Sequence, residues 1–204
     1  MMNRLFSYRA LGLAAIIGAL LVAPSAASAA YSYSGDTSWC QAGEFSQPFL
    51  GLKDSNLYEP APGFDQGGFN GQGWTLEGGA RVVTVQAGGV SQQVLELPSG
   101  ARATSPVLCV QSNYPTARGV VRSVLGGGGV ETLVGYQGQP SWEKAQPAGA
   151  YKGKAAEWTV APAMNIKPYG GYEGWQPMHI VLQGQGKGLD YQVAQLWIDP
   201  RYGH

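Results

Sequence analysis

Charged residues are scarce in this chain, and histidine and cysteine are scarcer still. Asp, Glu, Lys and Arg together make up 13% of the 204 residues, and there are only two histidines and two cysteines. Long surface helices need charged faces, and no window after residue 30 shows apolar residues at helical spacing without an interrupting Gly or Pro. The composition therefore excludes a helical protein. Nucleic acid is not expected as a partner either, because no basic stripe is present.

Recognisable catalytic motifs are also missing. His179 is the only histidine before the C-terminal residue and lies in an apolar, strand-like run, which favours a structural role over that of a base. Ser91 lacks the second glycine of a nucleophile elbow, and no glycine-rich phosphate loop precedes a helix. We predict no catalytic residue and no metal ligand. A hydrolase that uses two of the scattered carboxylates stays open as an alternative.

The first 29 residues have the three parts of a secretory signal peptide. Arg4 and Arg9 provide the positive start, residues 10–23 form an apolar run, and Ala27-Ser28-Ala29 matches the cleavage rule. The apolar run has about fourteen residues, fewer than the roughly 20 that a membrane-spanning helix needs. We expect cleavage, export and no membrane attachment afterwards, with the product secreted or kept in the cell envelope. An uncleaved membrane anchor is the alternative.

Residues 30–204 are expected to form a single all-β domain. Without Arg4 and Arg9, 11 basic residues remain against 13 acidic residues, a net charge of about −2. Glycine is abundant, with 31 residues in the whole chain, and short β-rich segments alternate with glycine-rich turns. About nine strands at this spacing predict a β-sandwich. They are expected at residues 73–77, 80–87, 92–97, 106–111, 118–125, 130–136, 157–161, 178–184 and 191–199.

Several local features of this pattern lead to specific expectations. Residues 106–111 are apolar on both faces, as in a buried central strand, and Gly126 to Gly129 are expected to close a hairpin. Residues 54–73 and 137–154 are expected to be loops. Three tryptophans in strand patterns are expected in the core: Trp74, Trp158 and Trp197.

Cys40 and Cys109 are expected to form a disulfide. Both lie in the exported part, and an even pair in an oxidising compartment most simply pairs. Two free buried thiols are the alternative, and a metal site is disfavoured because no histidine accompanies them.

A series of landmarks across the mature chain resembles a group of uncharacterised secreted bacterial proteins. The landmarks are Cys40, Gln47-Pro48-Phe49-Leu50, Pro62-Gly63-Phe64-Asp65, Gly73-Trp74, Gly78-Gly79-Ala80, Ala103-Thr104-Ser105-Pro106, Cys109, Tyr114-Pro115-Thr116-Ala117-Arg118 and Asp199-Pro200. More loosely, the order resembles the jelly-roll, galactose-binding-like modules attached to secreted glycoside hydrolases. That resemblance implies a jelly-roll sandwich that binds carbohydrate.

The same resemblance implies a structural Ca²⁺ site, but this chain departs from the pattern. Phe64-Asp65-Gln66 stands where two carboxylates are expected, and Ala194-Gln195 stands where the last strand often has paired Asp. Hard cations take six to eight oxygen ligands, so no cofactor is predicted, and a structural Ca²⁺ is the alternative that the resemblance implies.

The strongest indication of a binding site is a group of aromatic residues in a glycine-rich segment. Tyr169, Tyr172 and Trp175 fall within seven residues, and rings displayed from a loop stack well on sugar rings. The alternative is that they fold back over the core. We therefore predict an exported, non-catalytic binding module whose partner is an extracellular or cell-wall polysaccharide. A structural or adhesive surface protein without a small ligand is the main alternative.

Overall fold

The larger of two β-sheets contains nine strands. The computed structural model describes residues 31–40, 43–65, 67–111, 115–167 and 172–200, and the expected signal peptide lies outside them. The sheet has the order β13-β10-β17-β7-β4-β3, with β14 paired to β10, β2 to β17 and β6 to β7. Its strands are β2 (Glu59–Pro60), β3 (Phe64–Asp65), β4 (Gly68–Phe69), β6 (Arg81–Ala87), β7 (Val90–Pro98), β10 (Thr116–Leu125), β13 (Thr159–Val160), β14 (Met164–Asn165) and β17 (Asp190–Asp199).

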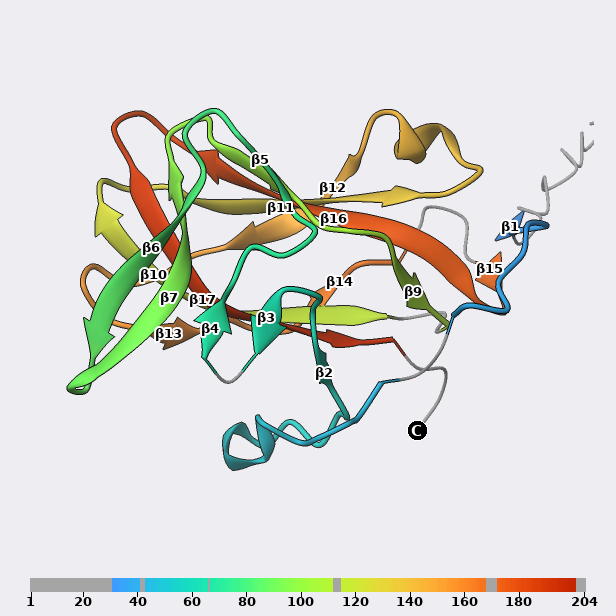
Figure 1. Ribbon diagram of the computed structural model, residues 1–204, viewed down its shortest axis with the longest axis horizontal. Coiled ribbons are helices and arrows are strands. Elements are labelled where there is room, and N and C mark those ends of the chain that lie inside the picture. The colour runs from blue at the N-terminus through green and yellow to red at the C-terminus, as the bar shows by residue number, and fades with distance from the viewer. Residues whose placement is uncertain (1–30, 41–42, 66, 112–114, 168–171, 201–204) are drawn as a thin grey trace, which may run out of the picture.

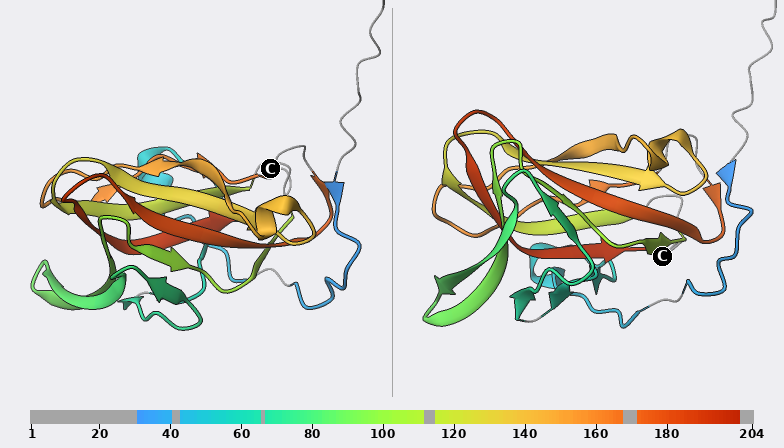
Figure 2. Two further views of the ribbon diagram at one scale, coloured as in Figure 1. Left: turned by 90° about the horizontal axis from the view of Figure 1, so that it is seen from above. Right: turned by 45° about the horizontal axis from the view of Figure 1, so that its top comes forward.

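The smaller sheet has six strands and packs against the larger one, so that the two layers enclose the core (Figure 2). Its order is β12-β11-β16-β8-β5, with β9 also paired to β16. Its strands are β5 (Thr75–Glu77), β8 (Arg102–Thr104), β9 (Leu108–Val110), β11 (Gly129–Tyr136), β12 (Gln146–Tyr151) and β16 (Gln176–Gln185). A separate parallel pair joins β1 (Tyr31–Ser32) to β15 (Tyr172–Glu173), and the two helical turns are η1 (Leu50–Leu52) and η2 (Pro140–Trp142).

Alternation along the strands places one face of each sheet in the core. On β16, Met178, Ile180 and Leu182 are fully buried in the core cluster, while His179 and Gln183 on the other face are only partly buried and Val181 on that face is buried outside the cluster. This two-residue period is why each of the nine predicted segments contains a strand. The predicted all-β sandwich is therefore confirmed. Neither helical turn in the described part of the chain has the length and apolarity of a membrane-spanning helix.

The wrapping of the chain is that of a jelly roll. Neighbouring strands β10, β17 and β7 of the larger sheet connect directly to β11, β16 and β8, which are neighbours in the smaller sheet. The three connections gather at one end of the sandwich, opposite the β1–β15 pair (Figure 1). There the Ser99 N–H donates to the Leu189 carbonyl at 3.0 Å, and the Gly100 N–H donates to the Gly184 carbonyl at 2.9 Å.

The predicted glycine hairpin is wrong. β10 and β11 belong to different sheets and do not pair, so residues 126–128 cross between the layers. Gly128 has φ +127°, and a Cβ there would lie 2.1 Å from the Gln185 carbonyl oxygen. Gly126 and Gly128 are needed for close backbone approach at this corner rather than for a tight turn.

Three other expectations also need correction. Strand β12 forms inside the segment 137–154 that we expected to be a loop, and β2 to β4 form inside 54–73. β9 has only three residues and pairs with β16 alone, so it is not a central strand. Trp74 is in the core as expected, but Trp158 and Trp197 are partly exposed and outside the core cluster.

Candidate functional site

The N-terminal segment 31–40 lies along one end of the sandwich and is attached at both of its ends. β1 pairs with β15 through Tyr31 and Tyr172, and the Cys40–Cys109 disulfide joins the segment to β9, with 5.6 Å between the Cα atoms. The predicted disulfide is therefore confirmed. We call this part of the molecule, formed by residues 31–40, β9 and β15 with the adjoining Trp175, the aromatic end.

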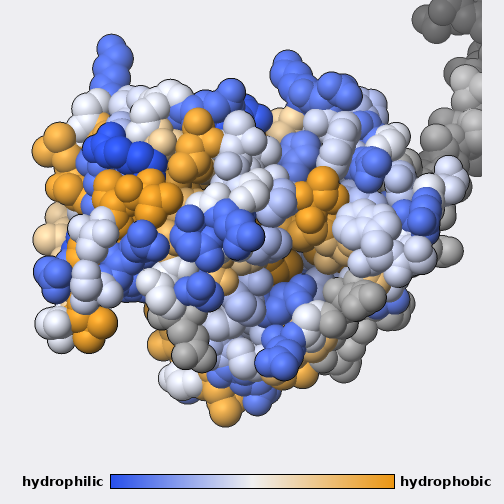
Figure 3. All heavy atoms as spheres, viewed as in Figure 1, coloured by the Kyte–Doolittle hydropathy of each residue, from blue (hydrophilic) through white to orange (hydrophobic). Residues whose placement is uncertain are grey.

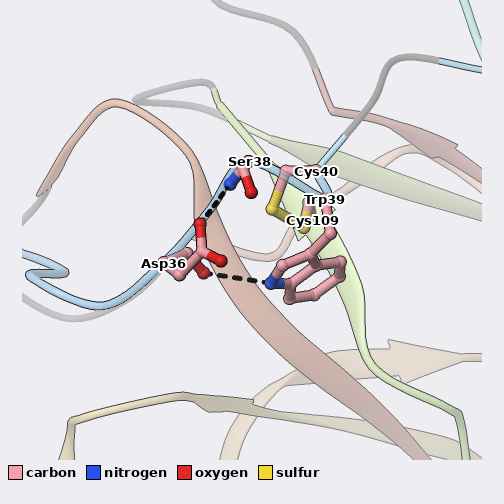
Figure 4. The surroundings of a disulfide bond; sticks show 5 residues. All are labelled: Asp36, Ser38, Trp39, Cys40 and Cys109. Carbon is pink, nitrogen blue, oxygen red and sulfur yellow. Dashed lines mark hydrogen bonds between the residues drawn. A yellow bond between two sulfur atoms is a disulfide. The ribbon is translucent and has the colours of Figure 1, made fainter.

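Trp39 is the most accessible tryptophan placed at this end. Its side chain is 48% exposed, and its indole Nε1–H donates to the Asp36 carbonyl oxygen at 3.0 Å. The Ser38 N–H donates to the Asp36 carboxylate at 2.8 Å and lowers the pKa of that group, so Asp36 stays ionised beside the ring (Figure 4). This local turn and the neighbouring disulfide orient an aromatic side chain that solvent can reach.

Trp39 stands at a pocket of about 230 Å³ beside the disulfide. Small-molecule sites usually measure roughly 300–1,000 Å³, so this pocket has room for one ring or one substituent rather than a whole chain. One side comes from the N-terminal segment and β9, and the other from β2 and the end of β17. The lining residues are Trp39, Cys40, Glu59, Pro60, Ala61, Pro62, Leu108, Cys109 and Ile198.

Glu59 is the one charged residue in that lining. Its Oε2 accepts a hydrogen bond from the Gly43 N–H at 2.8 Å, and its Oε1 accepts none from any described residue. Burial raises the pKa of Glu59, the Gly43 N–H opposes that rise, and the charge of Asp199 adds to it. A Cβ at residue 43 would lie 2.1 Å from Oε2, so the Glu59 carboxylate would have to shift. Glu59 thus gives the pocket lining a partly buried carboxylate that can accept a further hydrogen bond.

Of the three aromatic residues predicted to bind a ligand, only Trp175 has a side chain that the structure describes. Tyr169 lies outside the described residues, and for Tyr172 only the backbone, in β15, is described. Trp175 is partly buried and directly precedes Gln176, which pairs with Val110 beside Cys109. Their contact with a ligand stays a prediction.

Sequence reasoning missed Trp39 and Glu59. The available signal for Trp39 was its position next to a half-cystine, since a disulfide fixes the backbone of its neighbours. No comparable signal marks Glu59, because its approach to Trp39 depends on the β2–β17 pairing.

The predicted structural role of His179 and the metal-binding potential of the described residues can be examined directly. His179 contacts Trp142, with 4.6 Å between the ring centroids, and its pKa is lowered by burial and then by the charge of Arg102. No group of three or more His, Cys, Asp or Glu side chains in the described part of the chain is placed to hold a metal ion. Small apolar groups and polar side chains alternate over the face in Figure 3, which does not present one broad apolar surface.

Comparison with known proteins gives similar structures but no matching family. No family model and no curated protein matches this chain. A tandem CBM22 domain of Paenibacillus barcinonensis Xyn10C is 16% identical, over 80% of this chain and 47% of that one, with a TM-score of 0.46. The β-1,3-glucan-binding CBM6 of Bacillus halodurans is 12% identical, over 68% and 92% of the two chains, with a TM-score of 0.45. The xylan-binding CBM22-1 domain of the same Paenibacillus enzyme is 16% identical, over 65% and 88%, with a TM-score of 0.42. Similarity this low assigns no ligand to this chain.

Proposed function

We propose that this chain is an exported, non-catalytic binding module whose aromatic end contacts a polysaccharide. The observation that supports the proposal most directly is that Trp39, 48% exposed, lines the same pocket as the partly buried carboxylate residue Glu59. A sugar ring has an apolar face that stacks on an aromatic ring and hydroxyl groups that donate to such an acceptor. One tryptophan and one acceptor are sufficient to orient one sugar unit.

The proposed ligand site extends from Trp39 to the predicted residues Tyr169, Tyr172 and Trp175. The β1–β15 pairing brings the backbone of Tyr172 against the start of the same segment that contains Trp39. A polysaccharide is longer than the pocket, so neighbouring sugar units need contacts outside it. The aromatic segment is the proposed source of those contacts.

The proposed location is outside the cytoplasm, either secreted or in the cell envelope. A disulfide persists in oxidising compartments, which agrees with the signal peptide expected at residues 1–29. The proposed partner is accordingly an extracellular or cell-wall polysaccharide. Sequencing the N-terminus of the exported protein tests this directly, and the expected first residue is Ala30 or Tyr31.

Binding of the mature protein to a glycan array, followed by titration calorimetry of each hit, tests the proposed function. Trp39→Ala should weaken binding about fivefold, because a stacked ring contributes about 1 kcal/mol. Its melting temperature should change little, since Trp39 is largely exposed. Trp175→Ala should also weaken binding several-fold with little change in melting temperature. A loss of about 3–5 kcal/mol of stability would instead make Trp175 a core residue.

Trp158→Ala is the matched control for loss of an aromatic ring. Trp158 is partly exposed on the outer face of the larger sheet, where the Arg122 guanidinium lies 4.5 Å from its ring centroid. This variant should bind like the unchanged protein. If no glycan on the array binds, the proposal is wrong and a structural or adhesive role becomes the better explanation.

A further inference from the structure

The charge of the pocket at the aromatic end is unbalanced. Both ion pairs found among the described residues, Arg81–Glu96 and Arg118–Asp54, lie on the outer face of the larger sheet, away from the lining. Glu59 has no such partner among the described residues, and every other lining residue is uncharged. The pocket is therefore electronegative because of one side chain.

A partly buried carboxylate without a cation is an unfavourable arrangement. Burial removes water from the charged group, and buried charges in proteins are normally paired. The single N–H from Gly43 compensates only one oxygen, Oε2, and leaves Oε1 without a described donor. A ligand with a positive charge at this position would provide both the missing donor and the missing charge.

The remaining features of the pocket also favour a cation. Tryptophan is the side chain whose ring face attracts cations most strongly, and the Trp39 ring lines the same pocket as Glu59. Asp36 is outside this lining, and its backbone carbonyl fixes the ring by accepting from the indole Nε1–H (Figure 4). An indole ring and a carboxylate in the lining of one pocket suit an ammonium group better than a neutral hydroxyl.

We propose that this pocket recognises the protonated amino group of an amino sugar, so that the module prefers a glycan with free glucosamine-type units. This inference rests on the proposed function and specifies its ligand. The ammonium group would donate to Oε1 of Glu59 while the ring of the same sugar unit lies against Trp39. An N-acetylated unit has no charge to offer, and a neutral hexose offers only hydroxyl donors.

Three hexasaccharides with the same β-1,4 backbone separate these cases. They differ only at carbon 2, which bears a free amine, an N-acetyl group or a hydroxyl. Titration calorimetry at about pH 6 and about 0.15 M salt keeps amines protonated and screens distant charges. We expect the free-amine hexamer to bind about tenfold more tightly than either neutral one, a difference of about 1.4 kcal/mol.

Glu59→Gln provides the decisive variant, because the amide oxygen can still accept from Gly43 while the charge is removed. The preference for the free amine should fall to within about twofold, with binding of the neutral hexamers unchanged. Glu77→Gln is the control, since Glu77 is exposed on β5 and its loss changes the net charge equally. That variant should keep the full preference. Circular dichroism melts of both variants verify that they are folded.

The outcomes distinguish this inference from the function on which it rests. If all three hexamers bind equally well and Trp39→Ala weakens their binding, the amino-sugar preference is wrong. The proposed glycan-binding function would then still stand. A preference that survives in Glu59→Gln would overturn the assignment to this pocket. Absence of binding to any hexamer or to the glycan array would overturn both proposals.

Discussion

Removal of the Cys40–Cys109 disulfide should reduce both the stability of the protein and its affinity for a ligand, for two different reasons. The bond closes a loop with a sequence separation of 69 residues. In the chain-entropy treatment, a loop of this length constrains the unfolded chain by about 4 kcal/mol. The double variant Cys40→Ser, Cys109→Ser should therefore lose about 4 kcal/mol of its free energy of unfolding.

Binding should decline for a local reason. Within the described part of the chain, the backbone of residues 31–40 bonds to the rest of the protein only through the β1–β15 pair. Without the disulfide, the segment that contains Trp39 is anchored only by the β1–β15 pair. Ligand binding must then order this segment, and the entropy cost of doing so lowers the affinity. We expect at least a fivefold weaker affinity at a temperature where the double variant is still folded.

Urea unfolding followed by circular dichroism measures the first effect, and calorimetry with the best glycan ligand measures the second. The unchanged protein after reduction is the matched control and should behave like the double variant. A loss of less than about 1 kcal/mol, together with unchanged affinity, would refute both the loop-closure estimate and the positioning of Trp39 by the disulfide.

Other regions of the molecule lead to three further predictions. Arg118→Ala should cost about 3–5 kcal/mol in urea unfolding, because it leaves the Asp54 carboxylate unpaired where both side chains are only 12–13% exposed. Gly128→Ala should destabilise by about 1–3 kcal/mol, whereas Gly127→Ala, with nothing within 4 Å of its Cβ, should be nearly neutral. Burial raises the folded-state pKa of Asp190, so its ionisation opposes folding as the pH rises above the unfolded value. Asp190→Asn should therefore raise the melting temperature near pH 7, and the gain should vanish below about pH 3.9.

The sequence predicted the strands well because their signal is local. On β10, Ala117 and Val121 face the core while Arg118 and Arg122 face outward, and this period can be read without knowing the partner strand. Glycine-rich turns have no such signal. Whether Gly128 closes a hairpin or crosses between sheets depends on which strand pairs with β10, and that partner, β17, lies about 70 residues away.

The tryptophans also show what a strand pattern cannot predict. The pattern shows that successive side chains point to opposite faces of the sheet, but it does not show whether other residues cover the outer face. Trp197 alternates with buried Leu196 and Ile198 and therefore lies on the outer face, where Phe49 contacts it with 6.1 Å between ring centroids. Only the tertiary position of η1 and its flanking residues shows that this outer face is partly covered.

The aromatic end depends on the sheets behind it. Trp39, Glu59 and Cys109 are far apart in sequence, and they meet because β2 pairs with β17 while β9 pairs with β16, two long strands joined directly to each other. Each contributing segment is short, but each is hydrogen-bonded to a ten-residue strand or cross-linked by the disulfide. A ligand that enters therefore meets side chains whose backbone is already ordered. Little of the stacking and hydrogen-bond energy would then be lost in ordering the protein, which is why we expect one exposed tryptophan and one carboxylate to give measurable affinity.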